Sequence, residues 1–266
     1  MRAYFSYFKS EILVGLQYKA AALGGLSTQL FWGVILMFIY HAFYSYSSID
    51  SINFKELMCY LWLGQSFFSL TIPNMTDYET LENIRNGVVA YELCRPYDLY
   101  IWWFLKQLSK RLANCMLRCL PIIVIAFLLP EPYNLILPGS FGSFILFIIT
   151  MLFGVLIIVG INMIVLLISF FTYNDKGISS IVTSITCLLS GFTIPLPLLP
   201  DAFNNICKYL PFRLICDSSY RVYSLNIPYS EAFSNIVLQI IWIIILILVG
   251  RKIMRIALKK VEVQGG

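Results

Sequence analysis

The chain has 266 residues, of which 59% are hydrophobic and 12% are charged, and its formal net charge is +5. Soluble domains carry about 25% charged residues, so this composition excludes an ordinary soluble protein and indicates an all-α integral membrane protein. No long polar segment could form a second domain, so residues 1–266 are predicted to be one transmembrane domain. The basic residues flank apolar stretches, as topology signals do, which argues against a nucleic-acid partner.

Residues 1–20 are predicted to form a helix that lies in the membrane interface. The apolar side chains fall on one helical stripe and the polar ones lie elsewhere. The stripe consists of Tyr4, Phe5, Phe8, Ile12 and Leu16. A basic leader without regular structure is the alternative. The uninterrupted apolar run from Ile12 to Leu16 is shorter than the 7–15 residues, roughly, that a cleavable signal requires.

Six later stretches have about the 20 residues needed to cross a bilayer. They are residues 23–44, 55–73, 108–129, 140–171, 177–199 and 232–250. The fourth is too long for a perpendicular crossing, so it must tilt, bend near Gly154 or Gly160, or extend into the cytoplasm. Most Lys and Arg residues fall on the side that holds both termini, and the positive-inside rule therefore predicts cytoplasmic termini.

Residues 74–106 form the largest predicted cytoplasmic segment. The sequence Thr76-Asp77-Tyr78-Glu79 is a capping box, which predicts a helix that begins near Asp77. Asn86-Gly87 predicts its end, because glycine accepts the left-handed backbone conformation. A short capped helix below the membrane would suit a docking site for a soluble partner, and a solvated connector is the alternative.

Two polar residues within the spans have more than one interpretation. Arg118 would cost at least about 2.5–3.5 kcal/mol at the bilayer centre, so it either snorkels or pairs within the subunit, or it lines a substrate path. Asn162 is open to the same question. As a group, Gln29, Gln65, Asn114, Asn162 and Gln239 are predicted to form hydrogen bonds between packed helices. His41 lies among aromatic residues and is predicted to belong to an interfacial aromatic belt.

The fifth span meets closely spaced prolines at Pro195, Pro197 and Pro200, and a further one follows at Pro211. A straight helix cannot pass through this stretch, and lipid does not tolerate unpaired backbone groups. The stretch is therefore predicted to form a short broken or re-entrant piece at a membrane face. Such pieces are expected to shape a passage more often than to serve as simple anchors.

The seven cysteines form no CxxC pair, so no metal site is indicated. Cys115 and Cys119 share a helix face and are predicted to be small packing residues. A disulfide between Cys207 and Cys216 is left open.

Two segments together resemble a known family. Ile84-Arg85-Asn86-Gly87 followed by Tyr91-Glu92-Leu93-Cys94-Arg95-Pro96 is similar to the I-R-x-G … Y-x-L-x-R-P cytoplasmic loop of type-two, export-class ABC transporter permeases. The stretch from Ser190 through Leu196, followed by Leu199-Pro200 and Leu210-Pro211-Phe212, resembles their S-G-F-x-x-P-L … F-P … L-P-F segment before the last span. Leu199 stands where the family often has Phe.

The resemblance implies the transmembrane subunit of an ATP-driven exporter, which pairs with an identical or homologous permease and docks an ABC ATPase. ATP and Mg²⁺ would bind to that ATPase, because this chain has no GxxxxGK[ST] motif. Three residue sets follow. The ATPase-coupling loop would contain Leu81, Glu82, Ile84, Arg85, Asn86, Gly87, Tyr91, Glu92, Leu93, Arg95 and Pro96. Residues 196–230 would form short extracellular broken or re-entrant helices before the last span, which act as a gate or lid rather than as a central binding site. The extracellular gate or cap would contain Gly191, Phe192, Pro195, Pro197, Pro200, Pro211 and Phe212, and Arg118 and Asn162 are the candidates for lining the pathway.

The expected location is the plasma membrane of a bacterium, with several spans in contact with lipid. The chain itself would have no catalytic residue and no cofactor. The alternative function is a secondary transporter that works without an ATPase, but such proteins usually have internal repeats and helix breaks near the midplane. An intramembrane enzyme is disfavoured because the spans contain no carboxylate pair, no His/Asp constellation and no HExxH motif.

Overall fold

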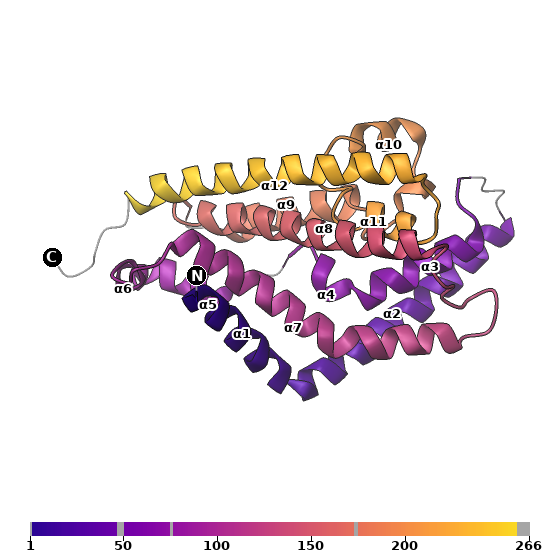
Figure 1. Cartoon of the computed structure of the whole chain (residues 1–266), viewed down its shortest axis with the longest axis horizontal. Helices are drawn as coiled ribbons and strands as arrows, with labels where there is room; N and C mark the ends of the chain where they lie inside the picture. Colours follow the sequence, from indigo (N-terminus) through magenta and orange to yellow (C-terminus); the bar gives the residue numbers. More distant parts are fainter. Residues whose placement is uncertain (1, 47–50, 75–76, 173–174, 260–266) are drawn as a thin grey trace.

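The computed structural model describes residues 2–46, 51–74, 77–172 and 175–259, which form helices and no strand. The bundle is elongated, and its long helices run roughly along the longest axis (Figure 1). In chain order the elements are α1 (Arg2–Gln17), α2 (Lys19–Tyr46), α3 (Phe54–Ser66), α4 (Phe68–Thr71), α5 (Tyr78–Arg85), α6 (Val89–Leu93), α7 (Leu99–Leu128), α8 (Phe141–Ile168), α9 (Asp175–Leu189), a 3₁₀ turn (Leu196–Leu198), α10 (Asp201–Cys207), α11 (Asp217–Tyr223) and α12 (Tyr229–Leu258).

Four of the described helices are long and apolar enough to cross a membrane, namely α2, α7, α8 and α12. They coincide with four of the six expected spans. The second expected span is divided at Phe67 into α3 and α4, and the fifth ends as a helix at Leu189 after 15 residues. Both are shorter than the length of about 20 residues that a single straight crossing needs. The all-helical membrane fold is confirmed, and the six-span topology stays a prediction.

The helix α7 begins at Leu99, within the predicted cytoplasmic segment 74–106, and the cytoplasmic location of that segment stays a prediction. Asp98 precedes the helix, and its carboxylate accepts a hydrogen bond from the amide of Ile101 at 3.1 Å. With Asp98 as the N-cap, the helix begins at Leu99, nine residues before the predicted span 108–129. The first turns are held in place by the buried side chains of Tyr100 and Trp103.

The helix α1 packs along α7. Tyr7 stacks on Trp102 with ring centroids 3.7 Å apart, and the hydroxyl of Tyr4 accepts a hydrogen bond from the amide of Asp98 at 2.7 Å. Of the predicted apolar stripe, Tyr4, Phe8, Ile12 and Leu16 are half-buried and Phe5 is 71% exposed. The position of α1 in the membrane interface stays a prediction.

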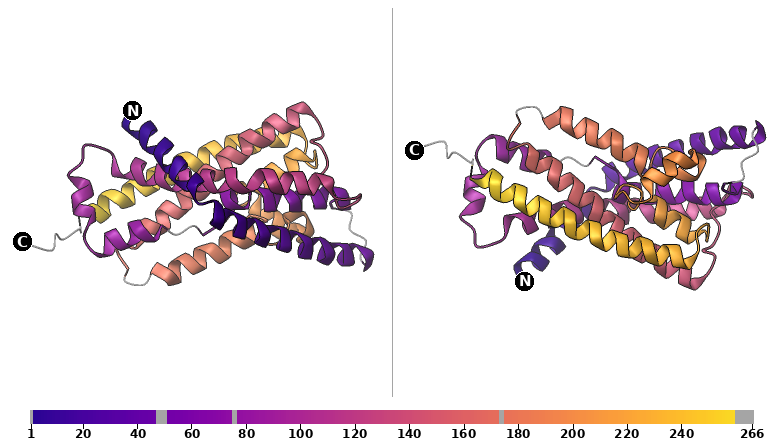
Figure 2. Two further views of the ribbon diagram at one scale, coloured as in Figure 1. Left: turned by 90° about the horizontal axis from the view of Figure 1, so that it is seen from below. Right: turned by 90° about the horizontal axis from the view of Figure 1, so that it is seen from above.

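The helix α8 runs through the middle of the bundle beside α12 (Figure 2). It is a continuous helix of 28 residues that ends at Ile168, three residues before the predicted span does. Gly154 and Gly160, the two possible positions of a bend, allow neighbouring segments to pack closely against α8. Gly160 receives Leu246 of α12, and Gly154 faces the backbone carbonyl groups of Leu214 and Ile215. A side chain at either glycine would have to displace its neighbour.

Two ends of the bundle differ in their contents. The α6 end contains α5, α6, the beginning of α7 and the end of α12, and the α11 end contains α10, α11 and the beginning of α12 (Figure 1). The two ends are referred to by these names below.

Candidate functional site

The helix α5 begins and ends where the sequence predicted. Asp77 precedes it, Asn86 follows it, and Gly87 has a φ of +69°, in the left-handed region that favours glycine. Thr76, the other half of the predicted capping box, lies outside the described residues. Asp77 does not cap the helix with its side chain. Its carboxylate instead connects α5 to α7.

The carboxylate of Asp77 is the centre of an ionic group that we call the Asp77 cluster, formed by Asp77, Glu79, Lys106 and Lys110. Asp77 lies 3.1 Å from Lys106 Nζ and 3.0 Å from Lys110 Nζ, and it accepts a hydrogen bond from Thr80 at 2.5 Å. Burial alone would raise the pKa of Asp77. The Thr80 hydrogen bond and the two ammonium groups have the larger, opposite effect, so the pKa lies below its usual value. The cluster therefore holds a charged carboxylate between α5 and α7.

The predicted coupling residues divide into an inward and an outward group. Leu81 is buried, Ile84 is half-buried, and Glu92 accepts a hydrogen bond from Trp103 Nε1 at 2.9 Å. These contacts attach α5 and α6 to the bundle. The outward group is exposed at the α6 end and consists of Glu82, Arg85, Asn86, Tyr91, Leu93, Arg95 and Pro96. This surface combines charged and apolar side chains on a firmly attached support.

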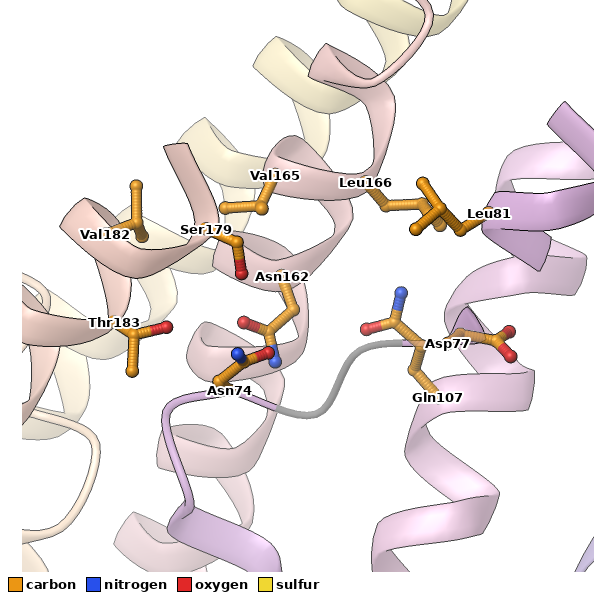
Figure 3. Close-up of a pocket in the computed structure, with 10 residues that line it drawn as sticks. All are labelled: Asn74, Asp77, Leu81, Gln107, Asn162, Val165, Leu166, Ser179, Val182 and Thr183. Carbon is orange, nitrogen blue, oxygen red and sulfur yellow. The ribbon is translucent and has the colours of Figure 1, made fainter. Parts of the chain in front are cut away.

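Asn162 lies in a small polar cleft, which we call the Asn162 cleft (Figure 3). The cleft has a volume of about 30 Å³, and its walls come from the segment before α5 and from α5, α7, α8 and α9. Asn162 Nδ2 and Gln107 Oε1 are buried there without a hydrogen-bond partner among the described residues. The space suits one or two water molecules of about 10–15 Å³ each in this measure, and it is too small for a transported compound.

Arg118 lies elsewhere, in a large cavity that we call the α2–α3 cavity. Its volume is about 500 Å³, within the range of about 300–1,000 Å³ that is typical of small-molecule sites. Its walls come from α2, from α3 and α4, from Arg118 on α7, from Tyr220 on α11, and from the segment after α9. The lining residues are Gly25, Thr28, Gln29, Trp32, Leu36, Tyr40, Tyr60, Leu61, Gly64, Gln65, Phe68, Arg118, Gly191, Phe192, Thr193, Pro195 and Tyr220.

The two residues predicted to line a pathway are thus in separate spaces. The guanidinium of Arg118 lies against Gly25, and its Nη2 donates a hydrogen bond to the carbonyl of Ala21 at 3.4 Å. No carboxylate of the described residues forms an ion pair with it.

The neutral polar residues predicted to connect helices behave differently from one another. Gln239 is fully buried, and its Nε2 donates hydrogen bonds to the carbonyl oxygens of Thr150 at 2.8 Å and of Leu214 at 2.9 Å. The packing interpretation holds for this residue. It is wrong for Gln29, which is 4% exposed and whose two amide atoms have no partner among the described residues.

The proline-rich segment after α9 forms one wall of the α2–α3 cavity. The helix α9 ends at Leu189, and Gly191 has a φ of +77°, after which Pro195 and Pro197 begin the 3₁₀ turn. Tyr60 Oη lies 3.1 Å from the carbonyl oxygen of Gly191 and holds the segment to α3. Of the predicted gate residues, Gly191, Phe192 and Pro195 line the cavity. Pro197, Pro200, Pro211 and Phe212 do not, because they shape the turns that follow.

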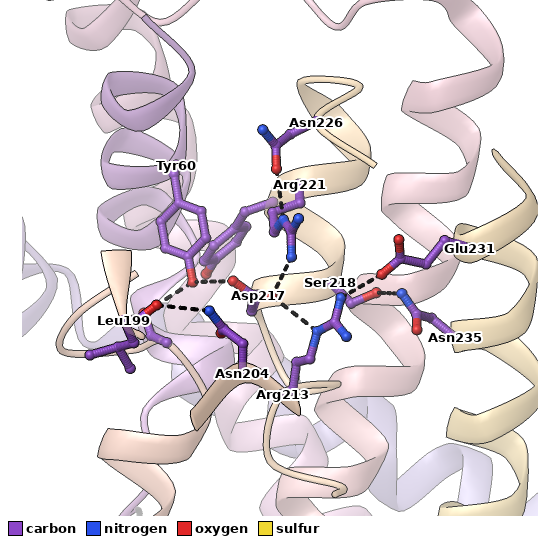
Figure 4. A network of polar contacts seen from close by, with 12 residues as sticks. Tyr60, Leu199, Asn204, Arg213, Asp217, Ser218, Arg221, Asn226, Glu231 and Asn235 are labelled. Atoms are coloured by element: carbon purple, nitrogen blue, oxygen red, sulfur yellow. Dashed lines mark hydrogen bonds and ion pairs between the residues drawn. The ribbon is translucent and has the colours of Figure 1, made fainter. Parts of the chain in front are cut away.

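A second ionic group, the Asp217 cluster, lies behind this wall and is formed by Asp217, Arg213, Arg221 and Glu231 (Figure 4). Asp217 is fully buried and lies 3.3 Å from Arg213 Nε and 3.7 Å from Arg221 Nη1. Arg213 also contacts Glu231 of α12 at 2.7 Å. Tyr60 Oη lies 3.2 Å from Asp217 Oδ1, so the cluster and the segment at Gly191 share one hydroxyl.

Sequence reasoning missed this cluster because it treated Arg213 and Arg221 only as topology signals. The spacing of Arg213, Asp217 and Arg221 was a usable signal, since opposite charges four residues apart meet on a helical turn. It also missed Arg111, which is fully buried and donates hydrogen bonds to the carbonyl oxygens of Leu70 at 2.8 Å and of Ile72 at 2.9 Å. Arg111 thereby satisfies carbonyl groups at the end of α4.

The remaining predictions concern cysteines and aromatic residues. Cys207 and Cys216 are both buried free thiols, so the structure contains no disulfide between them. His41 Nδ1 lies 3.1 Å from Tyr133 Oη, and the His41 ring meets Phe54 edge to face, so His41 belongs to an aromatic cluster; its place in an interfacial belt stays a prediction. Among the residues placed by the structure, no group of three or more His, Cys, Asp or Glu side chains could hold a metal ion.

Comparison with known families accounts for nearly the whole chain. Residues 30–265 match the family model described as ABC-2 family transporter protein. A search of curated protein sequences found no significant match. The matched range contains α5, α6, both ionic clusters, the Asn162 cleft and the α2–α3 cavity except for its lining residues Gly25, Thr28 and Gln29. The chain therefore belongs to the ABC-2 family of transporter proteins, and it is a membrane-embedded ABC transporter permease.

Proposed function

We propose that the chain is the membrane subunit of an ATP-driven exporter that couples to a separate ABC ATPase through α5 and α6. The observation that carries the proposal is the firm attachment of these helices to α7 by the Asp77 cluster and by Glu92. A displacement applied to a flexible linker would be absorbed locally. A displacement applied to α5 is passed to α7 through buried charge pairs and apolar contacts.

The proposed coupling through α5 and α6 also determines the orientation of the bundle in the membrane. The α6 end faces the cytoplasm, where the ATPase binds ATP and Mg²⁺, and the α11 end faces the outside of a bacterial plasma membrane. The exposed residues Tyr91, Leu93 and Glu82 contact the ATPase. Tyr91 is 76% exposed and Leu93 is 44% exposed, and apolar side chains of this size at a polar end of the bundle favour a protein partner.

The α2–α3 cavity contributes half of a pathway that a second permease, identical or homologous, completes. Its supporting features are the size of the cavity and the large exposed apolar side chains of α2, which include Phe31, Trp32 and Phe38. The segment from Gly191 to Pro200 acts as the gate at the α11 end. Because Tyr60 anchors Gly191, the gate opens by movement of the residues after Gly191 or together with α3 and α11.

The test is purification of the full chain with a co-expressed candidate ABC ATPase. We expect stable co-purification, and we expect Tyr91→Ala to reduce both ATPase capture and transport-linked ATP hydrolysis. Tyr46→Ala is the matched control, because Tyr46 is 92% exposed and is the last residue of α2, outside the coupling helices α5 and α6. Equal behaviour of the two variants, or uptake driven by a proton or sodium gradient in the chain alone, would contradict the proposal.

A further inference from the structure

We propose that the α2–α3 cavity binds an amphipathic organic anion, with its charged head at Arg118 and its apolar body along α2. The inference rests on the proposed function in one respect, that the cavity belongs to the transport path. It adds the chemical class of the ligand.

The shape of the cavity is suited to an elongated molecule. The lining residues of α2 extend from Gly25 to Tyr40 at helical spacing, which corresponds to about 22 Å at a rise of 1.5 Å per residue. The volume of about 500 Å³ suits one single-chain amphiphile.

The charge of the cavity is determined by one residue. Arg118 is the single ionisable group with a formal charge at neutral pH among the described lining residues. Its Nε is buried without a hydrogen-bond partner in the described chain, and its one hydrogen bond, to Ala21, is long. A guanidinium in this state favours an anion, because carboxylate and sulfate groups match its donors and charged hydrogen bonds are stronger than neutral ones.

A second group next to this end of the cavity lacks a partner. Gln29 is almost completely buried, lines the cavity one helical turn from Gly25, and has both amide atoms free of hydrogen bonds within the described residues. Buried polar atoms are normally paired, so an amide in this state indicates a ligand or solvent contact. Its Nε2 can donate to the same anionic head that Arg118 binds.

The rest of the cavity determines the body of the ligand. Trp32, Leu36, Phe68 and Phe192 provide apolar and aromatic surface, and Phe192 packs against Phe68 with ring centroids 5.2 Å apart. The cavity also contains the hydroxyl groups of Thr28, Tyr40, Thr193 and Tyr220 and the amide of Gln65, but its continuous aromatic and aliphatic wall favours an apolar body, and the guanidinium repels cations. The expected order of affinity is therefore anionic, then neutral, then cationic amphiphile.

Gly25 provides a selective way to disturb the head site. A Cβ at Gly25 would collide with the Arg118 guanidinium, whereas a Cβ at Gly24 has no neighbour within 4 Å. Gly25→Ala therefore displaces the guanidinium, and Gly24→Ala makes the same chemical change in the same helix without touching it.

The experiment measures quenching of tryptophan fluorescence by 12-bromododecanoate in the purified full chain, in nanodiscs of zwitterionic lipid and without any ATPase. The neutral probe is 12-bromododecanol, and the cationic probe is 12-bromododecyltrimethylammonium. We expect the anion to bind about tenfold or more tightly than the alcohol, as for one charged hydrogen bond. Arg118→Gln and Gly25→Ala should remove this preference, and Gly24→Ala should retain it. Trp32→Phe should reduce the quenching, which places the probe in the cavity.

Two results would overturn the proposal. One is equal affinity for anion and alcohol in the unmodified chain, and the other is an unchanged preference in monodisperse Arg118→Gln and Gly25→Ala variants. Competition by the anionic phospholipid phosphatidylglycerol identifies the anion as a membrane lipid, and lack of competition identifies it as a free amphiphile; the binding chemistry is supported in both cases. Because no ATPase is present, loss of anion preference is distinguishable from loss of coupling in Tyr91→Ala.

Discussion

The Asp77 cluster and the Asp217 cluster contain the same charges, two acidic and two basic side chains, but they lie at opposite ends of the bundle in different surroundings. At the α11 end, Asp217 is fully buried and Arg213 is 7% exposed. At the α6 end, Asp77 and Lys106 are also buried, with 3% and 10% of their side chains exposed, but Lys110 is 35% exposed and Glu79 is 69% exposed. Buried charge pairs become costly when one partner is removed, whereas solvated pairs contribute little. The comparison indicates that the α11 end is fixed, while the α6 end is attached but remains accessible to a partner.

Substitution of Asp217 by Asn should have the largest effect on stability. It leaves Arg213 and Arg221 without their shared buried carboxylate, and the expected loss is about 3–5 kcal/mol in the free energy of unfolding. Thermal unfolding of the purified protein in detergent measures it. Glu131→Gln is the control, because Glu131 pairs with Lys55 at the surface, and this variant should not change the unfolding temperature measurably. Similar unfolding temperatures for both variants would remove the distinction between buried and solvated charge.

Tyr60→Phe tests whether the Asp217 cluster also holds the gate segment. The change removes the hydroxyl that contacts Gly191 and Asp217, at an expected cost of about 1.5–3 kcal/mol for a hydrogen bond to a charged group. In addition, Cys187, which precedes Gly191, should react faster with a membrane-permeant maleimide. The control is Tyr133→Phe, which removes the exposed hydrogen bond to His41. If Cys187 is labelled at the same rate in Tyr60→Phe as in the unmodified chain, the Asp217 cluster does not hold the gate segment in place.

Asp77→Asn should affect stability less and coupling more. We expect a loss of about 1–2 kcal/mol, reduced from the value for a fully buried pair because Lys110 is partly solvated and Lys106 keeps Glu79 as a partner. ATP hydrolysis by the bound ATPase should then continue with less transport. Glu82→Gln, an exposed change on the same helix, is the stability control. A variant that transports normally would show that the attachment of α5 to α7 is not needed for coupling.

The smallest expected effect is a dependence of stability on pH at the α6 end. The pKa of Asp77 is lowered in the folded chain, so its contribution is complete above the unfolded value of about 3.9 and is lost as the pH falls through the lower folded value. The difference in unfolding temperature between the unmodified chain and Asp77→Asn should therefore stay constant from pH 7 to about pH 5 and shrink below about pH 4. A difference that remains constant to pH 3 would contradict the assignment of the charge.

Local signals in the sequence were sufficient for part of this architecture. Gly87 predicted the end of α5, and Pro195 and Pro197 predicted the interruption after α9, because backbone geometry depends on a few neighbouring residues. Contacts between distant residues were not predictable in this way. Arg118 and Asn162 looked equivalent as polar residues in apolar helices, yet one lines a large cavity and the other a small cleft. Tyr60 and Asp217 are 157 positions apart, and no local pattern connects them.

The contact at Gly154 has a consequence for how the region from 196 to 230 can be exchanged between related proteins. Gly154 is the middle residue of α8, about 20 Å from its first turn at 1.5 Å per residue, and it faces the carbonyl oxygens of Leu214 and Ile215. Gln239 of α12 donates to the same carbonyl of Leu214. The region from 196 to 230 therefore reaches into the middle of the bundle at Leu214 and Ile215, where it contacts both α8 and α12. Transplanted into a related protein, it should pack correctly only if that protein has a glycine at the position of Gly154 and a hydrogen-bond donor at the position of Gln239.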